Sequence, residues 1–193
     1  MKLTPIPYEE WDFEALAAIS PGMQPPPLNV VHFFAHHPEL ARQFLSWNHY
    51  VNSSRTSTLP KPTREVAVLR VAARRDNAYE WKQHNSIARR AGLTEPEIAA
   101  IADGTATGPH GLIVTAVDEL YDDGALTVAT ADALAGQFTE QQLIELVFLV
   151  GTYSMFSMVL NVFGVEPDPD LDETNFDGRS REAKQARQAE KGN

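Results

Sequence analysis

The sequence predicts an all-α fold with seven to nine helices. Apolar residues recur along most of the chain at the three- and four-residue spacing of amphipathic helices. No stretch sustains the apolar–polar alternation of a strand, since residues 125–129 are too few to count. Proline, glycine and capping residues interrupt the apolar runs, so each run is expected to form a separate helix.

The first half of the chain is expected to contain four helices. Asn29 is a suitable N-cap for the second, and Pro38 and Pro62 suit the first turns of the third and fourth, where a backbone N–H has no partner to lose. The proline-rich residues 20–27 are expected to be a stiff connector. The four expected helical segments are 8–19, 29–37, 38–51 and 62–75.

The second half is expected to contain five more helical segments. Asp76 is the expected N-cap of the first. Thr94 with Glu97, and Thr139 with Gln142, have the spacing of capping boxes, so a helix should begin after each threonine. The five segments are 77–91, 94–102, 109–121, 130–136 and 140–163.

The longest expected helix, 140–163, is apolar almost all round its axis. This pattern predicts burial on every side, either inside one chain or between subunits. A chain of 193 residues can form one sizeable core, so we expect a single domain over residues 1–165. Residues 166–193 form a charged tail that is expected to be extended or partly disordered, or to lie on a neighbouring subunit.

The amino-acid composition excludes several classes of partner and of chemistry. The net charge is −10, which argues against binding to nucleic acid or to an anionic membrane. The chain has no cysteine, which excludes disulfides, thiol nucleophiles and thiolate metal sites. No secretory signal and no continuous apolar run long enough for a membrane span are evident, so we expect a soluble cytoplasmic protein without a membrane partner.

Four polar residues between positions 64 and 93 are the best candidates for chemistry. Asn77, Glu80 and His84 fall at i, i+3 and i+7, on one face of a helix. Glu65 belongs to the preceding helix and meets that face only if the two helices pack as a hairpin. Histidine transfers protons near neutral pH, and two nearby carboxylates would separate into an acid and a base. The alternative is a solvated Glu–His pair without a catalytic role.

A second group, His32 and His36, has the i, i+4 spacing of half a metal site. No third ligand stands at a recognisable spacing. We therefore predict no metal and interpret these residues as surface or packing histidines.

The stretch that contains Glu65 and His84 resembles the carboxymuconolactone decarboxylase family, which shares its fold with the alkyl-hydroperoxidase D proteins. The resemblance is carried by the sequences REVAVLRVA, YEWKQH and ARRAGLTEPEI, and it extends from about residue 5 to residue 165. It implies a helical bundle with the Glu/His hairpin at its centre, a homo-oligomer (a dimer or higher), a small-molecule substrate and no cofactor.

The family has two kinds of activity, and this sequence is compatible with only one of them. Peroxidase members have a CxxC pair where this chain has Asn77 and Glu80, so thiol peroxidase activity cannot operate here. Decarboxylase members act on a carboxylated γ-lactone without a thiol. We therefore expect an acid/base enzyme for a small lactone or enolisable acid, related to carboxy-lyases.

Each candidate site residue then has an expected role. His84 is the principal acid/base, Glu65 its orienting or relay carboxylate, and Glu80 a second base or a group that faces the substrate. Asn77, at a helix N-terminus, is expected to bind an anionic substrate. Two residues of the last helix, Tyr153 and Asn161, are expected to line the pocket. The competing interpretation is a non-catalytic oligomeric helical protein that binds a small ligand or a partner.

Overall fold

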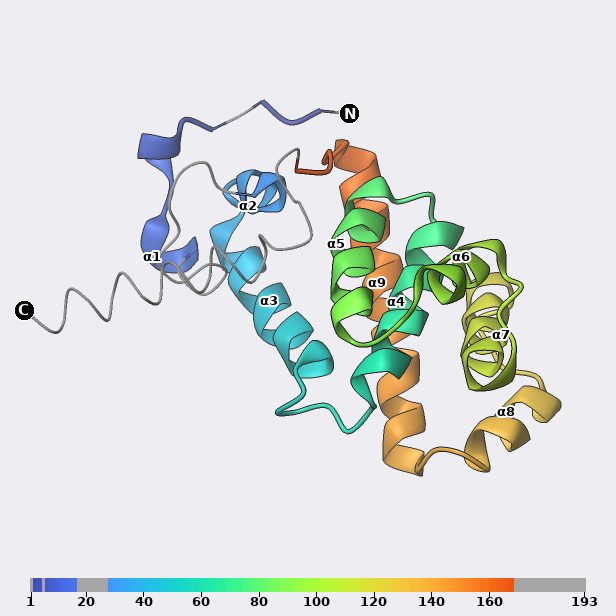
Figure 1. Cartoon of the computed structure of the whole chain (residues 1–193). Helices are drawn as coiled ribbons and strands as arrows, with labels where there is room; N and C mark the ends of the chain where they lie inside the picture. Colours follow the sequence, from blue (N-terminus) through green and yellow to red (C-terminus); the bar gives the residue numbers. More distant parts are fainter. Residues whose placement is uncertain (1, 5, 17–27, 169–193) are drawn as a thin grey trace, which may run out of the picture. The chain divides into compact units, whose positions relative to one another are not determined.

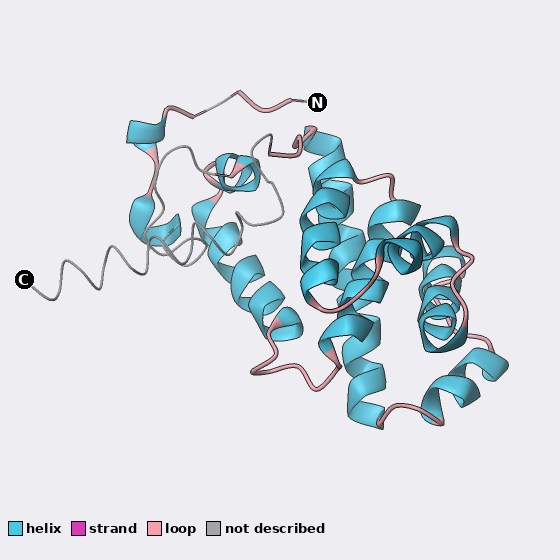
Figure 2. Ribbon diagram, viewed as in Figure 1, coloured by secondary structure: helices cyan, strands magenta, loops and turns pink. Residues whose placement is uncertain are grey.

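The computed structural model describes residues 2–4, 6–16 and 28–168 of the chain. Within these ranges every regular element is a helix, which confirms the predicted all-α class (Figure 1, Figure 2). The elements are η1 (Tyr8–Glu10), α1 (Phe13–Leu16), α2 (Asn29–Phe34), α3 (Pro38–Asn52), α4 (Lys61–Arg74), α5 (Ala78–Arg90), α6 (Glu95–Asp103), α7 (Gly108–Asp122), α8 (Val128–Ala135) and α9 (Glu140–Phe163).

The chain divides into two compact units. The first consists of Met1–Trp47 with Phe163–Asn193, and the second of Asn48–Val162. A single domain can contain two compact units, so this division neither confirms nor contradicts the expected single domain over residues 1–165, which stays a prediction. The connector predicted at 20–27 lies outside the described residues, as do residues 169–193 of the expected tail.

Helix α4 is the centre of the second unit. It contacts α5, α6 and α7 (Figure 1). Nine consecutive residues of this helix, 64–72, are buried. Valine, alanine and leucine occupy six of these positions, so apolar packing surrounds the helix, but Arg64, Glu65 and Arg70 are enclosed with them. Three buried charges on one helix require three sets of partners.

The turn between α4 and α5 differs from the prediction. Asp76 was the expected N-cap of α5, and this is wrong: Asp76 adopts a left-handed conformation with φ of 47°. The cap is Asn77, whose Oδ1 accepts a hydrogen bond from the backbone N–H of Glu80 at 2.8 Å. Asp76 reverses the chain, and the next residue is then placed to cap. The result is the helix hairpin that the sequence predicted.

Both capping boxes are confirmed, but both expected ends of the 29–37 helix are wrong. The backbone N–H of Thr94 donates to Glu97 at 2.8 Å, and that of Thr139 donates to Gln142 at 3.0 Å. Asn29 was the expected N-cap and is instead the first residue of α2, while Leu28 occupies the cap position without a side-chain hydrogen bond. The helix expected to reach residue 37 instead ends at Phe34. A proline at position 38 disfavours helical geometry in the residue before it, which explains the early end.

Helix α9 has one buried face and one exposed apolar face. Leu146, Leu149 and Leu160 are each at most 1% exposed, whereas Phe148 is 54% exposed. The expectation of burial on every side is therefore wrong within a single chain. By length and composition α9 is also the one helix in the described ranges that could span a membrane, a property that it shares with core helices of soluble proteins.

Arg70 connects three helices. Its guanidinium binds both carboxylate oxygens of Asp118 on α7, at 2.7 and 2.8 Å. Its Nη1 also donates to the backbone carbonyls of Ile101 and Ala102 at the end of α6, at 3.2 and 2.6 Å. The side chain of Arg70 thus closes the carbonyl end of α6 and ties it to α4 and α7.

Replacing Arg70 should destabilise the second unit. Arg70→Met leaves the carboxylate of Asp118 without its bidentate partner and two helix-end carbonyls unpaired, so we expect a loss of about 3 kcal/mol in the free energy of unfolding. Urea denaturation followed by circular dichroism measures this change. Arg42→Ala is the matched control, because it removes an exposed pair with Glu39 and should leave stability unchanged. Equal stability of wild type and Arg70→Met would contradict the assignment.

Candidate active site

The hairpin brings Glu65 of α4 against His84 of α5. Oε2 of Glu65 lies 2.8 Å from Nδ1 of His84, within hydrogen-bond distance. The residues are 19 positions apart in the chain, so the contact depends on the packing of α4 against α5. This contact fixes the imidazole ring and directs its second nitrogen, Nε2, away from Glu65.

The second nitrogen of His84 faces Glu80. Nε2 lies 3.4 Å from Oε2 of Glu80, one helical turn earlier on α5. One imidazole therefore stands between two carboxylates. None of the three residues is more than 8% exposed. The solvated Glu–His pair that the sequence left open is therefore not what the structure contains.

Burial and charge shift the proton affinities of this group. For Glu80, burial raises the pKa to about 7, with the charge of Glu65 adding to burial and that of His84 opposing it. For His84, burial opposes the positive charge, but the charge and hydrogen bond of Glu65, together with Glu80, outweigh burial and raise the pKa above its ordinary value of 6.5. Near neutral pH, Glu80 is thus poised between acid and base, beside an imidazole whose protonated form is favoured.

Tyr153 of α9 completes the group. Its ring meets the imidazole of His84 edge-on, with ring centres 5.0 Å apart and planes at 87°. The side-chain amide of Asn52, at the end of α3, donates to the phenol oxygen of Tyr153. Burial raises the pKa of Tyr153 well above 10, and the negative charges of Glu80 and Glu65 add to that effect. The hydroxyl therefore remains protonated at neutral pH.

Asn77 and Asn161 lie beside this group but make structural hydrogen bonds. Beyond capping α5, the amide of Asn77 donates to the backbone carbonyl of Ser157 at 3.2 Å and to Oδ1 of Asn161 at 2.7 Å. Asn161 in turn donates to the backbone carbonyl of Arg75 at 2.7 Å. These bonds tie α9 to the hairpin and orient the first turn of α5, which carries Glu80. A role of either residue in substrate binding stays a prediction.

Sequence reasoning missed Asn52. No motif surrounds it, and its contact with Tyr153 joins positions 101 residues apart. Only the packing of the end of α3 against α9 reveals it. The amide of Asn52 also donates a hydrogen bond to Oδ1 of Asn48, one helical turn earlier. Both asparagine side chains form hydrogen bonds with the hydroxyl of Tyr153.

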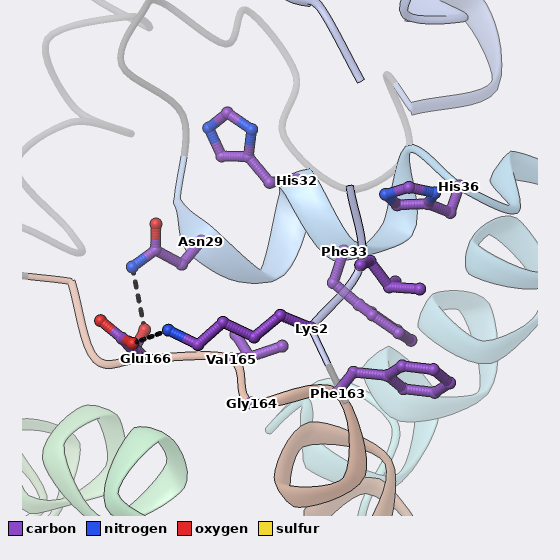
Figure 3. A pocket seen from close by; sticks show the side chains of 10 residues that line it. Lys2, Asn29, His32, Phe33, His36, Phe163, Gly164, Val165 and Glu166 are labelled. Atoms are coloured by element: carbon purple, nitrogen blue, oxygen red, sulfur yellow. Dashed lines mark hydrogen bonds and ion pairs between the residues drawn. The ribbon is translucent and has the colours of Figure 1, made fainter. Parts of the chain in front are cut away.

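A cavity of about 350 Å³ lies in the first unit, and none of the predicted site residues lines it (Figure 3). Two contacts lie in the lining of this cavity. Nζ of Lys2 donates a hydrogen bond to the carboxylate of Glu166 at 2.6 Å, and the ring of Phe33 packs against that of Phe163 (Figure 3). His32 and His36 line the cavity.

The histidines of this cavity have no metal-binding partners in the structure. The ring of His32 meets Trp11 edge-on at 4.7 Å, and burial lowers its pKa. In the described part of the chain no group of three or more His, Asp or Glu side chains is placed to hold a metal ion. The packing role expected for His32 agrees with its contacts.

The raised pKa values make stability fall with rising pH. Glu80 binds a proton in the folded state up to pH of about 7 but only up to about 4.5 when unfolded, so the free energy of unfolding decreases as pH rises through that window. His84 acts in the same direction, because its raised pKa gives stability that is lost as pH rises through the folded value.

Glu80→Gln should flatten this pH dependence. The neutral amide has no proton to lose, so at pH 8 the variant should be more stable than wild type by on the order of 3 kcal/mol, from 1.36 kcal/mol per pKa unit. Denaturation curves at a series of pH values measure the effect. Glu97→Gln is the control of opposite sign: hydrogen bonds from Thr94 lower the pKa of Glu97, so its contribution is lost as pH falls. Parallel curves for wild type and Glu80→Gln would refute the shift.

Comparison with known proteins bears on the family and the fold of this chain. The model of the carboxymuconolactone decarboxylase family matches residues 38–109, a range that includes Glu65, Glu80 and His84. No curated protein matches the chain.

Two solved structures have a similar fold. One is an alkylhydroperoxidase AhpD core protein, an uncharacterised peroxidase-related protein from Ralstonia eutropha JMP134, with 19% identity, a TM-score of 0.67 and coverage of 75% of this chain and 78% of that one. The other is an uncharacterised peroxidase-related protein from Silicibacter sp. TM1040, with 15% identity, a TM-score of 0.67 and coverage of 87% and 89%. At these identities the likeness shows the fold alone. The resemblance found in the sequence is confirmed over residues 38–109, which the model of the carboxymuconolactone decarboxylase family matches, and the cysteine-free chain has the AhpD-like helical fold.

Proposed function

We propose that this chain is a cofactor-free acid/base enzyme acting on a small carboxylated lactone or enolisable acid. The observation that carries the proposal is the imidazole of His84 held between two buried carboxylates, 2.8 Å from Glu65 and 3.4 Å from Glu80. Such a group donates and accepts protons at neutral pH without a metal, a thiol or an organic cofactor.

Decarboxylation is the reaction that the family region supports best. The bond between the carboxylate carbon and the lactone ring breaks, and CO2 leaves. The electron pair of that bond moves into the conjugated carbonyl. The resulting enolate then takes a proton at carbon, so the net change is one proton consumed for each CO2 released. Stabilising the enolate and supplying that proton are the tasks of the site.

The three side chains have separate roles in this scheme. His84 supplies the proton, because Glu65 and Glu80 raise its pKa above the ordinary value and so favour the protonated imidazole. Glu65 acts as a positioning residue that fixes the ring through Nδ1 and stabilises its charge. Glu80, with a pKa near 7, exchanges protons with Nε2 and restores the acid form between turnovers. Related proton transfers on enolisable acids, such as isomerisation or lactone opening, use the same steps.

The burial of the group supports a second candidate. With His84 8% exposed and Glu80 3% exposed, little of the pair is open to a substrate. A non-catalytic oligomeric protein that kept the fold after losing the thiols would also hold these side chains in a buried, paired state. Turnover measurements separate the two candidates.

The wild type should decarboxylate at least one member of a panel of carboxylated γ-lactones, and His84→Ala should lose about 10²- to 10⁴-fold in kcat, the range for removal of a general acid/base. CO2 release and the loss of lactone absorbance measure the reaction. His110→Ala is the matched control, since His110 lies 3.7 Å from Glu97 at the surface and should retain full activity. Equal rates for wild type and His84→Ala would remove His84 from the mechanism, and absence of turnover across the panel would favour the non-catalytic candidate.

Thiol-dependent peroxide consumption should remain at background. The chain has no cysteine to form a sulfenic acid, whatever the electron donor supplied. A peroxide electrode with dithiothreitol as donor tests this, using a buffer blank and heat-denatured protein as references. Turnover above both references would contradict the exclusion of thiol chemistry.

A further inference from the structure

Arg64, in the first turn of α4, is a buried cation whose hydrogen bonds go only to neutral groups. The residue is 2% exposed. Among the described residues, its guanidinium donates to the backbone carbonyl of Leu59 and, at 2.7 Å, to Oγ of Ser54. Its third nitrogen, Nε, is buried and has no hydrogen-bond partner in this part of the chain. Burying a guanidinium without an anionic partner costs free energy, so this arrangement requires an explanation.

Two other arginines of this chain show which edge of the guanidinium binds a carboxylate. Arg70 donates to the two oxygens of Asp118 through Nε and Nη2, at 2.7 and 2.8 Å. Arg42 donates to the two oxygens of Glu39 through the same atoms, at 3.0 and 2.7 Å. These two nitrogens form one planar edge that matches the geometry of a carboxylate. In Arg64 the same edge has one serine hydroxyl on Nη2 and no partner on Nε.

An unpartnered Nε does not identify a site by itself, because Nε of Arg75 also lacks a hydrogen-bond partner. The guanidinium of Arg75 stacks on the ring of Tyr121, 4.3 Å from the ring centre, and the residue is partly exposed. Water and the aromatic ring therefore compensate its charge. Arg64 lacks that exposure: burial lowers its pKa, and the negative charges of Glu65 and Glu145 only partly oppose this effect. The distinguishing feature of Arg64 is a buried charge combined with an incompletely paired edge.

The guanidinium of Arg64 lies close to the candidate active site, within the second unit. Arg64 directly precedes Glu65 in α4, and the charges of Glu65 and Tyr153 act on it in addition to burial. Ser54, which accepts from Nη2, is an exposed residue, so this edge of the guanidinium lies near the surface. A carboxylate that displaces the Ser54 hydroxyl replaces one neutral hydrogen bond with two charge-assisted ones, which are stronger.

We propose that Arg64 binds a carboxylate group of a small carboxylic acid through Nε and Nη2, and that Ser54 occupies this edge in the absence of the ligand. The inference rests on the proposed function for the identity of that acid as the substrate, but binding at Arg64 requires no turnover. Arg64 thus recognises the charged end of the substrate, beside the proton-transfer group of Glu65, Glu80 and His84.

Binding of a carboxylate that cannot react is the direct test. The saturated γ-butyrolactone-γ-carboxylate has no conjugated carbonyl to accept electrons, so it should bind without losing CO2. Calorimetric titration at millimolar concentrations should show saturable binding to the wild type, whereas γ-butyrolactone itself, which has no carboxylate, should show none. Arg64→Lys keeps the charge but loses the planar edge, so the probe should bind on the order of 10- to 100-fold more weakly. Arg75→Lys is the matched control and should bind the probe as the wild type does.

Ser54→Ala provides a test of opposite sign. It leaves Arg64 in place and changes an exposed residue, so it remains informative if Arg64→Lys does not fold. Removing the hydroxyl that competes for Nη2 should tighten binding of the probe by about 2- to 5-fold, the equivalent of one neutral hydrogen bond. If Arg64 serves only to hold Ser54 and Leu59, binding should instead be unchanged or weaker.

Three results would overturn the proposal: no carboxylate-dependent binding to the wild type, equal binding to wild type and Arg64→Lys, or no tightening in Ser54→Ala. Turnover of the carboxylated lactones separates this site from the proposed function. If the wild type binds the probe through Arg64 but turns over no lactone, the proposed function fails and the carboxylate site stands. If turnover depends on His84 but KM is the same in Arg64→Lys as in the wild type, the carboxylate site fails and the proposed function stands.

Discussion

The burial of residues 64–72 of α4 is the constraint on which the second unit depends. A helical segment enclosed in this way must pair each charge that it carries, and this segment carries three. Arg64 donates to Ser54 at 2.7 Å and to the carbonyl of Leu59, fixing the loop before α4. Glu65 binds His84 of α5, and Arg70 binds the end of α6 and Asp118 of α7. Each buried charge thus positions a different neighbour, and the candidate site is one of these three attachments.

The candidate site contains no thiol and pairs its imidazole with two carboxylates. At the positions where peroxidase members have cysteines, this chain has Asn77, which caps α5, and Glu80, which faces His84. The first replacement stabilises the helix start, and the second adds a carboxylate to an existing Glu–His pair. Both residues contribute to the local structure of the hairpin, Asn77 through the cap of α5 and Glu80 through its contact with His84.

Much of this arrangement could be predicted from the sequence, because it depends on local signals. Capping residues and proline set most of the helix ends, and the spacing of Asn77, Glu80 and His84 placed them on one face. The meeting of Glu65 with His84 required the additional assumption of a hairpin, which the short turn at Asp76 satisfies. Asn52 could not be predicted, since only tertiary packing joins it to Tyr153. The exposed face of α9 was also missed, because an apolar pattern shows that a face avoids water without showing what covers it.

The lack of cysteine has one further consequence, for sensitivity to oxidants. The sulfur in this chain is confined to four methionines, and two of them, Met155 and Met158, are exposed on α9. Oxidation would convert these side chains to polar sulfoxides, and methionine sulfoxide reductases could reverse the change. In peroxidase members with the CxxC pair, oxidants act first on the catalytic centre. In this chain the same exposure would act on methionines of the exposed face of α9 and leave Glu65, Glu80 and His84 chemically intact.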